Sequence, residues 1–129
     1  MTTLREVQIT FDCANPRRVA AFWAQALGYV VPEDAAGVDA WSVAQDPTGA
    51  GPRLFFQQVP EPKTVKNRVH LDVRVGTGLV GEARLAALNA EADRLETHGA
   101  RRIELLLADE ENESTLVMAD VEGNEFCLD

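Results

Sequence analysis

The stretch Lys66–Asn67–Arg68–Val69–His70–Leu71–Asp72 leads into a strictly alternating segment of the chain. From Arg68 to Val75, polar and aliphatic residues take turns. Successive side chains of a strand point to opposite faces, so this pattern predicts a strand with one polar and one apolar face. The polar face carries Arg68, His70, Asp72 and Arg74. Such a face is either exposed to solvent or lines a pocket.

The residues after Val75 predict a helix and three further strands. A glycine-rich connector, Gly76–Gly81, leads into a helix from about Glu82 to His98, because leucines and alanines recur there at helical spacing. Gly99 follows as the expected cap. The strands that we expect next are Arg101–Leu107, Ser114–Ala119 and Asn124–Leu128.

The residues before the quoted stretch predict the same order of elements. Asn15 and Pro16 are typical of a helix start and Gly28 of a helix end. Around this helix we expect the strands Leu4–Asp12, Tyr29–Val31, Ala40–Gln45 and Arg53–Val59, with a loop at Glu33–Asp39. A linker with two prolines, Val59–Lys63, follows.

Both halves therefore have the order βαβββ. When the sequences of the two halves are aligned by this order of elements, Gln8 matches His70, Gly28 matches Gly99, and Asp46–Gly49 matches Asp120–Gly123. An internal repeat of this kind indicates two copies of one supersecondary unit. The sequence predicts a single α+β domain over residues 1–129, built from two tandem βαβββ modules at about 1–60 and 66–129.

Composition limits the classes of partner. The chain has 129 residues and a formal net charge of −9, which argues against nucleic acid and anionic membranes as partners. No apolar run approaches the roughly 18 residues that span a bilayer, and the N-terminus lacks the apolar core of a signal peptide. We therefore expect a cytoplasmic protein in which Cys13 and Cys127 are reduced thiols.

Three segments resemble the vicinal oxygen chelate superfamily, which includes glyoxalase I, type I extradiol dioxygenases, and the bleomycin- and fosfomycin-resistance proteins. The segments are Asp12–Tyr29, Lys66–Asp72 and Asp120–Cys127, and they look most like the group called glyoxalase-like domains. The resemblance implies that the mixed sheet of each module curls, that the two sheets form a shared concave cavity, and that the helices cover the outer faces. It also implies a small-molecule ligand and a homodimer.

In members of this superfamily that use a metal, the ligands come from the first and fourth strands of each module. Those positions fall on Gln8, Gln57, His70 and Cys127, with Glu125 on the same face as Cys127. Neutral amides are weak ligands for hard ions such as Mg²⁺ or Mn²⁺, so the residues predict no confident metal site. If a divalent ion is the cofactor, the ligands we expect are Gln8, His70 and Glu125.

The resemblance also suggests roles for the residues of the cavity. His70 is the expected general base or metal ligand, and Glu125 the second proton-handling group, with a pKa raised toward neutral by partial desolvation. Gln8, Gln57 and Trp41 would position the substrate, although Trp41 fits a core position equally well. Asp72 would pair with a neighbouring arginine or orient His70. Cys127 completes the set as a buried, inert thiol.

The chain lacks the GxSxG, P-loop, GxGxxG and CxxC motifs, which disfavours the chemistries that these motifs support. Two functions of different classes stay open. The first is a lyase or isomerase of the glyoxalase-like type that acts on a compact polar substrate. The alternative is a resistance-type protein that binds a small molecule or drug without chemistry, or an accessory module whose pocket is vestigial.

Overall fold

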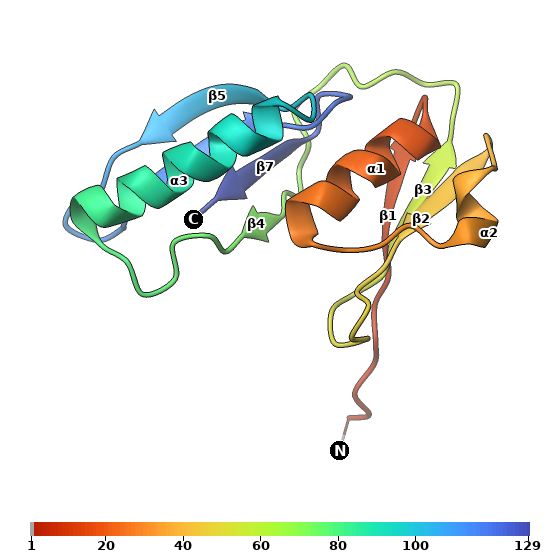
Figure 1. The fold of residues 1–129 in the computed structure, drawn as a ribbon, viewed down its shortest axis with the longest axis horizontal. Coiled ribbons are helices and arrows are strands. Elements are labelled where there is room, and N and C mark those ends of the chain that lie inside the picture. Colours follow the sequence, from red (N-terminus) through yellow and green to blue (C-terminus); the bar gives the residue numbers. More distant parts are fainter. Residues whose placement is uncertain (1) are drawn as a thin grey trace. The chain divides into compact units, whose positions relative to one another are not determined.

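The computed structural model describes residues 2–129. The chain divides into two compact units, the first ending at Pro62 and the second beginning at Lys63. The division falls inside the proline-containing segment that was expected as a linker. Figure 1 shows the helices and strands of both units.

Unit 1 is a three-stranded mixed sheet with one long helix on one face (Figure 1). The strands are β1 (Ile9–Cys13), β3 (Leu54–Gln58) and β2 (Trp41–Ala44), in that spatial order. β1 runs parallel to β3, and β2 runs antiparallel to it. α1 (Pro16–Leu27) packs against β2 and β3, and a single-turn helix, α2 (Glu33–Ala36), packs against β2.

The start and end of α1 are those that the sequence predicts. The side chain of Asn15 accepts a hydrogen bond from the backbone N–H of Arg18 at 3.2 Å, and Pro16 is the first helical residue. Gly28 ends the helix in the left-handed conformation with φ 70°. The side chain of Trp23 in this helix is fully buried.

Unit 2 is a four-stranded mixed sheet with one helix lying across it (Figure 1). The strands are β4 (Asp72–Val73), β7 (Glu125–Leu128), β6 (Thr115–Ala119) and β5 (Arg101–Leu106), in that spatial order. β4 runs parallel to β7, and the other neighbours are antiparallel. α3 (Gly81–Glu96) buries Leu88, Ala92 and Leu95 against the sheet.

Gly99 was predicted to cap α3, and its role differs from that prediction. The helix ends at Glu96 with Thr97 as the cap residue, two residues before the expected end. Gly99 lies in the turn that follows, with φ 101°, and a Cβ placed on it would lie 2.8 Å from a methyl carbon of Val121. The turn therefore requires glycine both for its backbone conformation and for space.

The predicted strand from Arg68 to Val75 is wrong in its extent, because only Asp72 and Val73 pair as a strand. From His70 to Val75 the expected alternation is present, with the aliphatic residues more buried than the polar ones. Upstream it fails, since Val69 is 80% exposed. Here the side chain of Asn67, rather than a backbone ladder, holds the segment to β7.

Three other expectations in unit 1 were also wrong in detail. The first strand begins at Ile9 rather than Leu4, whose side chain is 97% exposed. The segment Tyr29–Val31 contributes only one bridge, between Val30 and Gln45. The expected loop Glu33–Asp39 contains α2, which begins after Pro32 with two acidic residues, a composition that favours the first turn of a helix.

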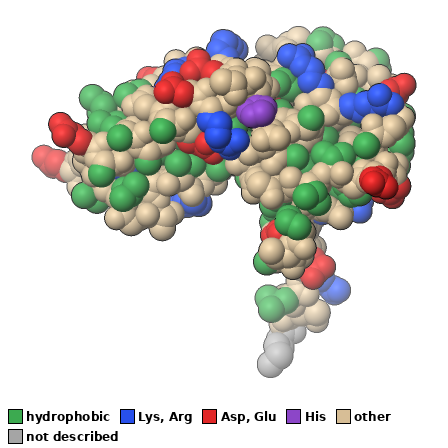
Figure 2. Space-filling model, in the orientation of Figure 1, with side chains coloured by type: hydrophobic (Ala, Val, Ile, Leu, Met, Phe, Trp, Pro, Cys, Tyr) green, Lys and Arg blue, Asp and Glu red, His purple; other side chains and the backbone are tan. Residues whose placement is uncertain are grey.

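The α+β class is confirmed, and each unit has an open sheet with a helix on one face. The cavity shared by two curled sheets stays a prediction. None of the helices over residues 2–129 has the length and apolar character needed to cross a bilayer. On the face shown in Figure 2, basic, acidic and apolar side chains are interspersed.

Candidate functional site

The polar candidates of unit 2 lie on the face of the sheet opposite α3. Asp72 of β4 is in register with Cys127 of β7, and Glu125 precedes Cys127 by two residues on the same face. Phe126 and Leu128 alternate with them and are fully buried on the other face. The alternation of β7 thus sets the polar face apart from the core.

His70 and Asp72 form a direct side-chain pair. Nε2 of His70 lies 3.1 Å from Oδ1 of Asp72, with about half of each side chain exposed. Of the roles open to Asp72 from the sequence, pairing with His70 is the one observed, because Arg74 instead pairs with Asp129 at 2.9 Å. A carboxylate that accepts from one imidazole nitrogen fixes the ring and leaves the other nitrogen available as an acceptor.

Glu125 is paired with Lys66, whose Nζ lies 2.5 Å from Oε2 of the carboxylate. This hydrogen bond is the largest cause of a lowered pKa for Glu125, and the charges of Lys66, Lys63 and His70 act in the same direction. The predicted rise of the Glu125 pKa toward neutral is therefore wrong. An ammonium group within hydrogen-bonding distance favours the charged carboxylate, and this effect exceeds the effect of partial burial.

The side chain of Asn67 forms hydrogen bonds with both the backbone N–H and the backbone carbonyl of Glu125. Its Oδ1 accepts from the N–H of Glu125 at 2.8 Å, and its Nδ2 donates to the carbonyl oxygen at 3.2 Å. Lys66 and Asn67 thus position the side chain and the backbone of the same residue. Neither role could be predicted from the sequence, because both contacts are made to a residue far along the chain.

Cys127 is buried and its pKa is raised to about 11. Burial is the largest cause, and the neighbouring carboxylates of Asp72 and Asp129 add to it. A thiol with this pKa stays protonated at neutral pH and is a poor nucleophile. The buried position predicted for Cys127 is observed, and its inertness stays a prediction.

A hollow of 770 Å³ opens above these residues within unit 2. Its polar lining includes both residues predicted to handle protons, His70 and Glu125. Its apolar lining comes mainly from the end of β5, where three consecutive leucines are partly exposed. These leucines are Leu105, Leu106 and Leu107.

The amide candidates of unit 1 are both engaged in hydrogen bonds. Oε1 of Gln8 accepts from Nε of Arg53 at 2.9 Å. Nε2 of Gln57 donates to Oδ1 of Asp12 at 2.8 Å. Arg53 and Asp12 are therefore part of the surroundings of these amides, and the sequence alone gave no reason to single them out.

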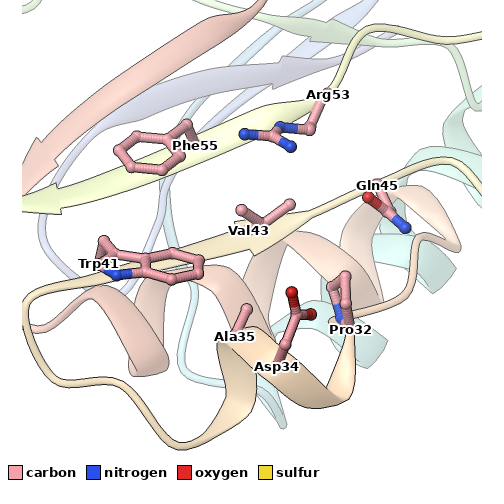
Figure 3. Close-up of a pocket in the computed structure, with 8 residues that line it drawn as sticks. All are labelled: Pro32, Asp34, Ala35, Trp41, Val43, Gln45, Arg53 and Phe55. Atoms are coloured by element: carbon pink, nitrogen blue, oxygen red, sulfur yellow. The ribbon is translucent and has the colours of Figure 1, made fainter.

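A second hollow, of 340 Å³, lies in unit 1 between α2 and the strands β2 and β3 (Figure 3). Trp41 lines this hollow and is only partly buried, and its role at the predicted shared cavity stays a prediction. Phe55 faces this hollow while Phe56 is fully buried beside α1, as their adjacent positions in a strand predict. The other lining residues were not expected, namely Pro32, Asp34, Ala35, Val43, Gln45 and Arg53.

The donor groups of unit 2 do not suit a hard metal ion. His70, Asp72 and Cys127 have one potential ligand atom each within 4.8 Å of one another. This set offers one imidazole, one carboxylate and one thiol, and it differs from the expected Gln8, His70 and Glu125. A thiol favours soft ions such as zinc over Mg²⁺ or Mn²⁺, and the Glu125 carboxylate is already neutralised by Lys66.

Comparison with known proteins assigns the family. The profile of the family described as a glyoxalase-like domain matches residues 8–128. The chain belongs to the glyoxalase-like domains. The sequence-based resemblance to the vicinal oxygen chelate superfamily is thereby confirmed. No curated protein sequence matches this glyoxalase-like domain significantly.

Solved structures share the fold of this glyoxalase-like domain at low sequence identity. A glyoxalase/bleomycin resistance protein/dioxygenase family enzyme from Burkholderia phytofirmans is 14% identical, with a TM-score of 0.68 and 94% of each chain covered. The fosfomycin resistance protein FosX from Listeria monocytogenes, in complex with Mn(II) and 1S,2S-dihydroxypropylphosphonic acid, is 11% identical. Its TM-score is 0.70, over 99% of this chain and 90% of that one.

A possible glyoxalase from Bacillus cereus is similar to the same extent. It is 15% identical, with a TM-score of 0.65 and 98% of each chain covered. Since all three identities are below 16%, these likenesses establish the fold of the glyoxalase-like domain and leave its reaction to be argued from its own residues.

Proposed function

We propose that this glyoxalase-like domain is a small-molecule enzyme, a lyase or isomerase that moves a proton on a compact polar substrate. The observation that carries the proposal is the 3.1 Å contact between His70 and Asp72 at the edge of a 770 Å³ hollow. Hollows of this size fall within the roughly 300–1,000 Å³ range of small-molecule sites.

His70 acts as the general base in this proposal. The Asp72 carboxylate accepts a hydrogen bond from the protonated Nε2 of His70. Nδ1 therefore carries the lone pair that removes a proton from the substrate. The imidazolium that forms is stabilised by the same carboxylate. Asp72 is thus a positioning residue, because it acts through His70 rather than on the substrate.

Glu125 takes a role different from the one first expected. Its lowered pKa keeps the carboxylate charged at neutral pH, so it cannot donate a proton to the substrate. A charged carboxylate next to Lys66 instead orients a donor group of the substrate or accepts a proton late in the reaction. The roles predicted for Gln8, Gln57 and Trp41 in positioning a substrate stay predictions. The homodimer and the cytoplasmic location stay predictions.

The test compares His70→Ala and Glu125→Ala with the parent protein against a panel of aldehydes, thiohemiacetals and hydroxylated heterocycles. Loss of a general base lowers kcat by about a hundredfold or more. His98→Ala is the matched control, because it removes the other histidine of the chain, which is exposed near the end of α3. Turnover that is unchanged in both His70→Ala and Glu125→Ala would remove this mechanism.

A second candidate is a non-catalytic binding protein of the resistance type. The observation that favours it is the absence of a ligand set for a hard metal ion around His70, within residues 2–129. The net charge of −9 suits a cationic ligand. A thermal-shift screen followed by mass spectrometry separates the candidates, because a pure binder is stabilised by a ligand that is recovered unchanged.

A further inference from the structure

We propose that the hollow beside α2 in unit 1 binds a planar aromatic acid, that is, a flat conjugated ring carrying one anionic group. None of the residues that line this hollow lines the hollow of unit 2 beside His70, so the inference goes beyond the proposed function. The residues that carry it all belong to unit 1 and are drawn in Figure 3.

Two aromatic side chains form one wall of the hollow. The rings of Trp41 and Phe55 are 11° from parallel, with centroids 6.0 Å apart. The register of β2 and β3 pairs Trp41 with Gln57 and Val43 with Phe55, so the two rings are diagonal neighbours on the open face of the sheet. Each ring is only partly buried. The two rings are stacked on one another, and a flat ligand ring continues this stack with more contact than a puckered ring does.

The floor of the hollow is apolar and its size is limited. Val43 and Ala35 are buried beneath it, and Pro32 closes one side. A volume of 340 Å³ is near the lower end of the roughly 300–1,000 Å³ range of small-molecule sites. The space therefore suits a ligand of one or two rings rather than a large drug.

Arg53 places a cation over the Phe55 ring of the aromatic wall. Its guanidinium carbon lies 5.9 Å from the centroid of the Phe55 ring, and Figure 3 shows the group pointing toward that ring. Nε is bound to Gln8, which fixes the side chain and leaves the two terminal nitrogens for a ligand. No carboxylate of residues 2–129 forms an ion pair with Arg53. A guanidinium group matches a carboxylate or phosphonate through two parallel hydrogen bonds.

Asp34 limits the ligand to a single anionic group. Its carboxylate points into the hollow from α2, on the side opposite Arg53 (Figure 3). A second negative charge on the ligand would be repelled there, whereas a hydroxyl or amino group would be accepted. Among ligands with one charge, the anion is favoured because Arg53, and not Asp34, adjoins the aromatic wall.

Three probes of similar size test the class of ligand by isothermal titration calorimetry on the full chain. Benzoate combines a planar ring with an anion, cyclohexanecarboxylate keeps the anion on a puckered ring, and benzylammonium keeps the planar ring with a cation. We expect benzoate to bind about tenfold more tightly than cyclohexanecarboxylate, because only a flat ring continues the stack of the two aromatic side chains. Benzylammonium is expected to bind more weakly than benzoate.

Substitutions then locate the binding. Arg53→Gln is expected to lower the affinity for benzoate about tenfold, because it removes the charge-assisted hydrogen bonds to the carboxylate. Arg101→Gln is the matched control, since it removes the charge of an exposed arginine in unit 2 and should leave the affinity within about twofold. Trp41→Leu keeps an apolar side chain, and far-ultraviolet circular dichroism checks that it is folded before its affinity is read.

Three results would overturn the proposal: no benzoate binding, equal affinity for the two carboxylates, or tighter binding of benzylammonium. Unchanged benzoate affinity in Arg53→Gln would also overturn it. Benzoate binding in His70→Ala separates this inference from the proposed function. If affinity is retained and Arg53-dependent while no variant changes turnover, the proposed mechanism fails and the aromatic-acid site stands. If turnover depends on His70 while benzoate binds independently of Arg53, the reverse holds.

Discussion

Lys66 lies with its ammonium nitrogen 2.5 Å from Oε2 of Glu125, across 59 residues of sequence. The next residue, Asn67, binds the backbone of the same glutamate. These contacts replace the backbone ladder that the alternation upstream of His70 predicts. They also decide the charge of a proposed catalytic residue, because the Glu125 pKa is lowered chiefly by Lys66.

Lys66→Met should raise the pKa of Glu125. The lysine is the largest cause of the lowering, and its loss leaves the opposing effect of partial burial. The pKa can be followed by NMR of the side-chain carboxyl carbon through a pH titration. Lys63→Met is the control, because Lys63 acts only through its charge and should give a smaller shift. An equal shift in the two variants would contradict a specific role for Lys66.

The same pair predicts a pH dependence of stability. A carboxyl group whose folded pKa is lowered stabilises the protein above its unfolded pKa, and this contribution is lost as the pH falls through the folded pKa. Chemical denaturation at neutral and acidic pH measures the free energy of unfolding of the parent protein and of Lys66→Met. The difference between the two free energies should be smaller at acidic than at neutral pH. A larger difference in the free energy of unfolding at acidic pH would contradict a stabilising effect of the Lys66–Glu125 pair.

Asp72→Asn should lower kcat/KM by about ten- to a hundredfold through its effect on His70. An amide can present its NH₂ group to the imidazole and so reverse which ring nitrogen carries the proton. The pH profile should change with it, which a merely structural defect would not produce. Asp39→Asn serves as control and should retain the parent profile, because the Asp39 side chain is 88% exposed in its ion pair with Arg17.

Cys127 should react slowly with iodoacetamide at neutral pH and faster as the pH rises toward about 11. Asp72→Asn should speed the reaction, because the Asp72 charge raises the thiol pKa. Mass spectrometry of the digested protein distinguishes Cys127 from Cys13, which is also buried. Alkylation of Cys127 at neutral pH at the rate of a small free thiol would contradict the raised pKa.

Phe55 and Phe56 give a matched test of the two faces of β3. Phe56→Ala should cost about 3–5 kcal/mol of the free energy of unfolding, because the side chain is fully buried. Phe55→Ala should cost clearly less, since its ring lines a hollow and is already partly exposed. Urea denaturation measures both, and equal costs would mean that the two faces are not distinct.

Local sequence signals predicted much of the fold. The start and end of α1 follow from Asn15, Pro16 and Gly28, which act on their own backbone neighbours. The βαβββ order of unit 2 and the family were also readable from the chain, as was the division of Phe55 and Phe56 between two faces, whereas unit 1 has a second helix and only an isolated bridge in place of one predicted strand. Each of these depends on short-range spacing, which a sequence displays directly.

The charges and partners of the site depended on the tertiary structure. His70 and Glu125 could be named in advance, but the pairing of Glu125 with Lys66, and hence the direction of its pKa shift, required the packing of β7 against a segment 59 residues away. In the same way, Arg53 and Asp34 became candidates only when β3 and α2 were brought to one hollow. Spacing determined which faces are polar, and long-range packing alone decided which groups meet on them, because a side-chain pKa depends on neighbours in space rather than in sequence.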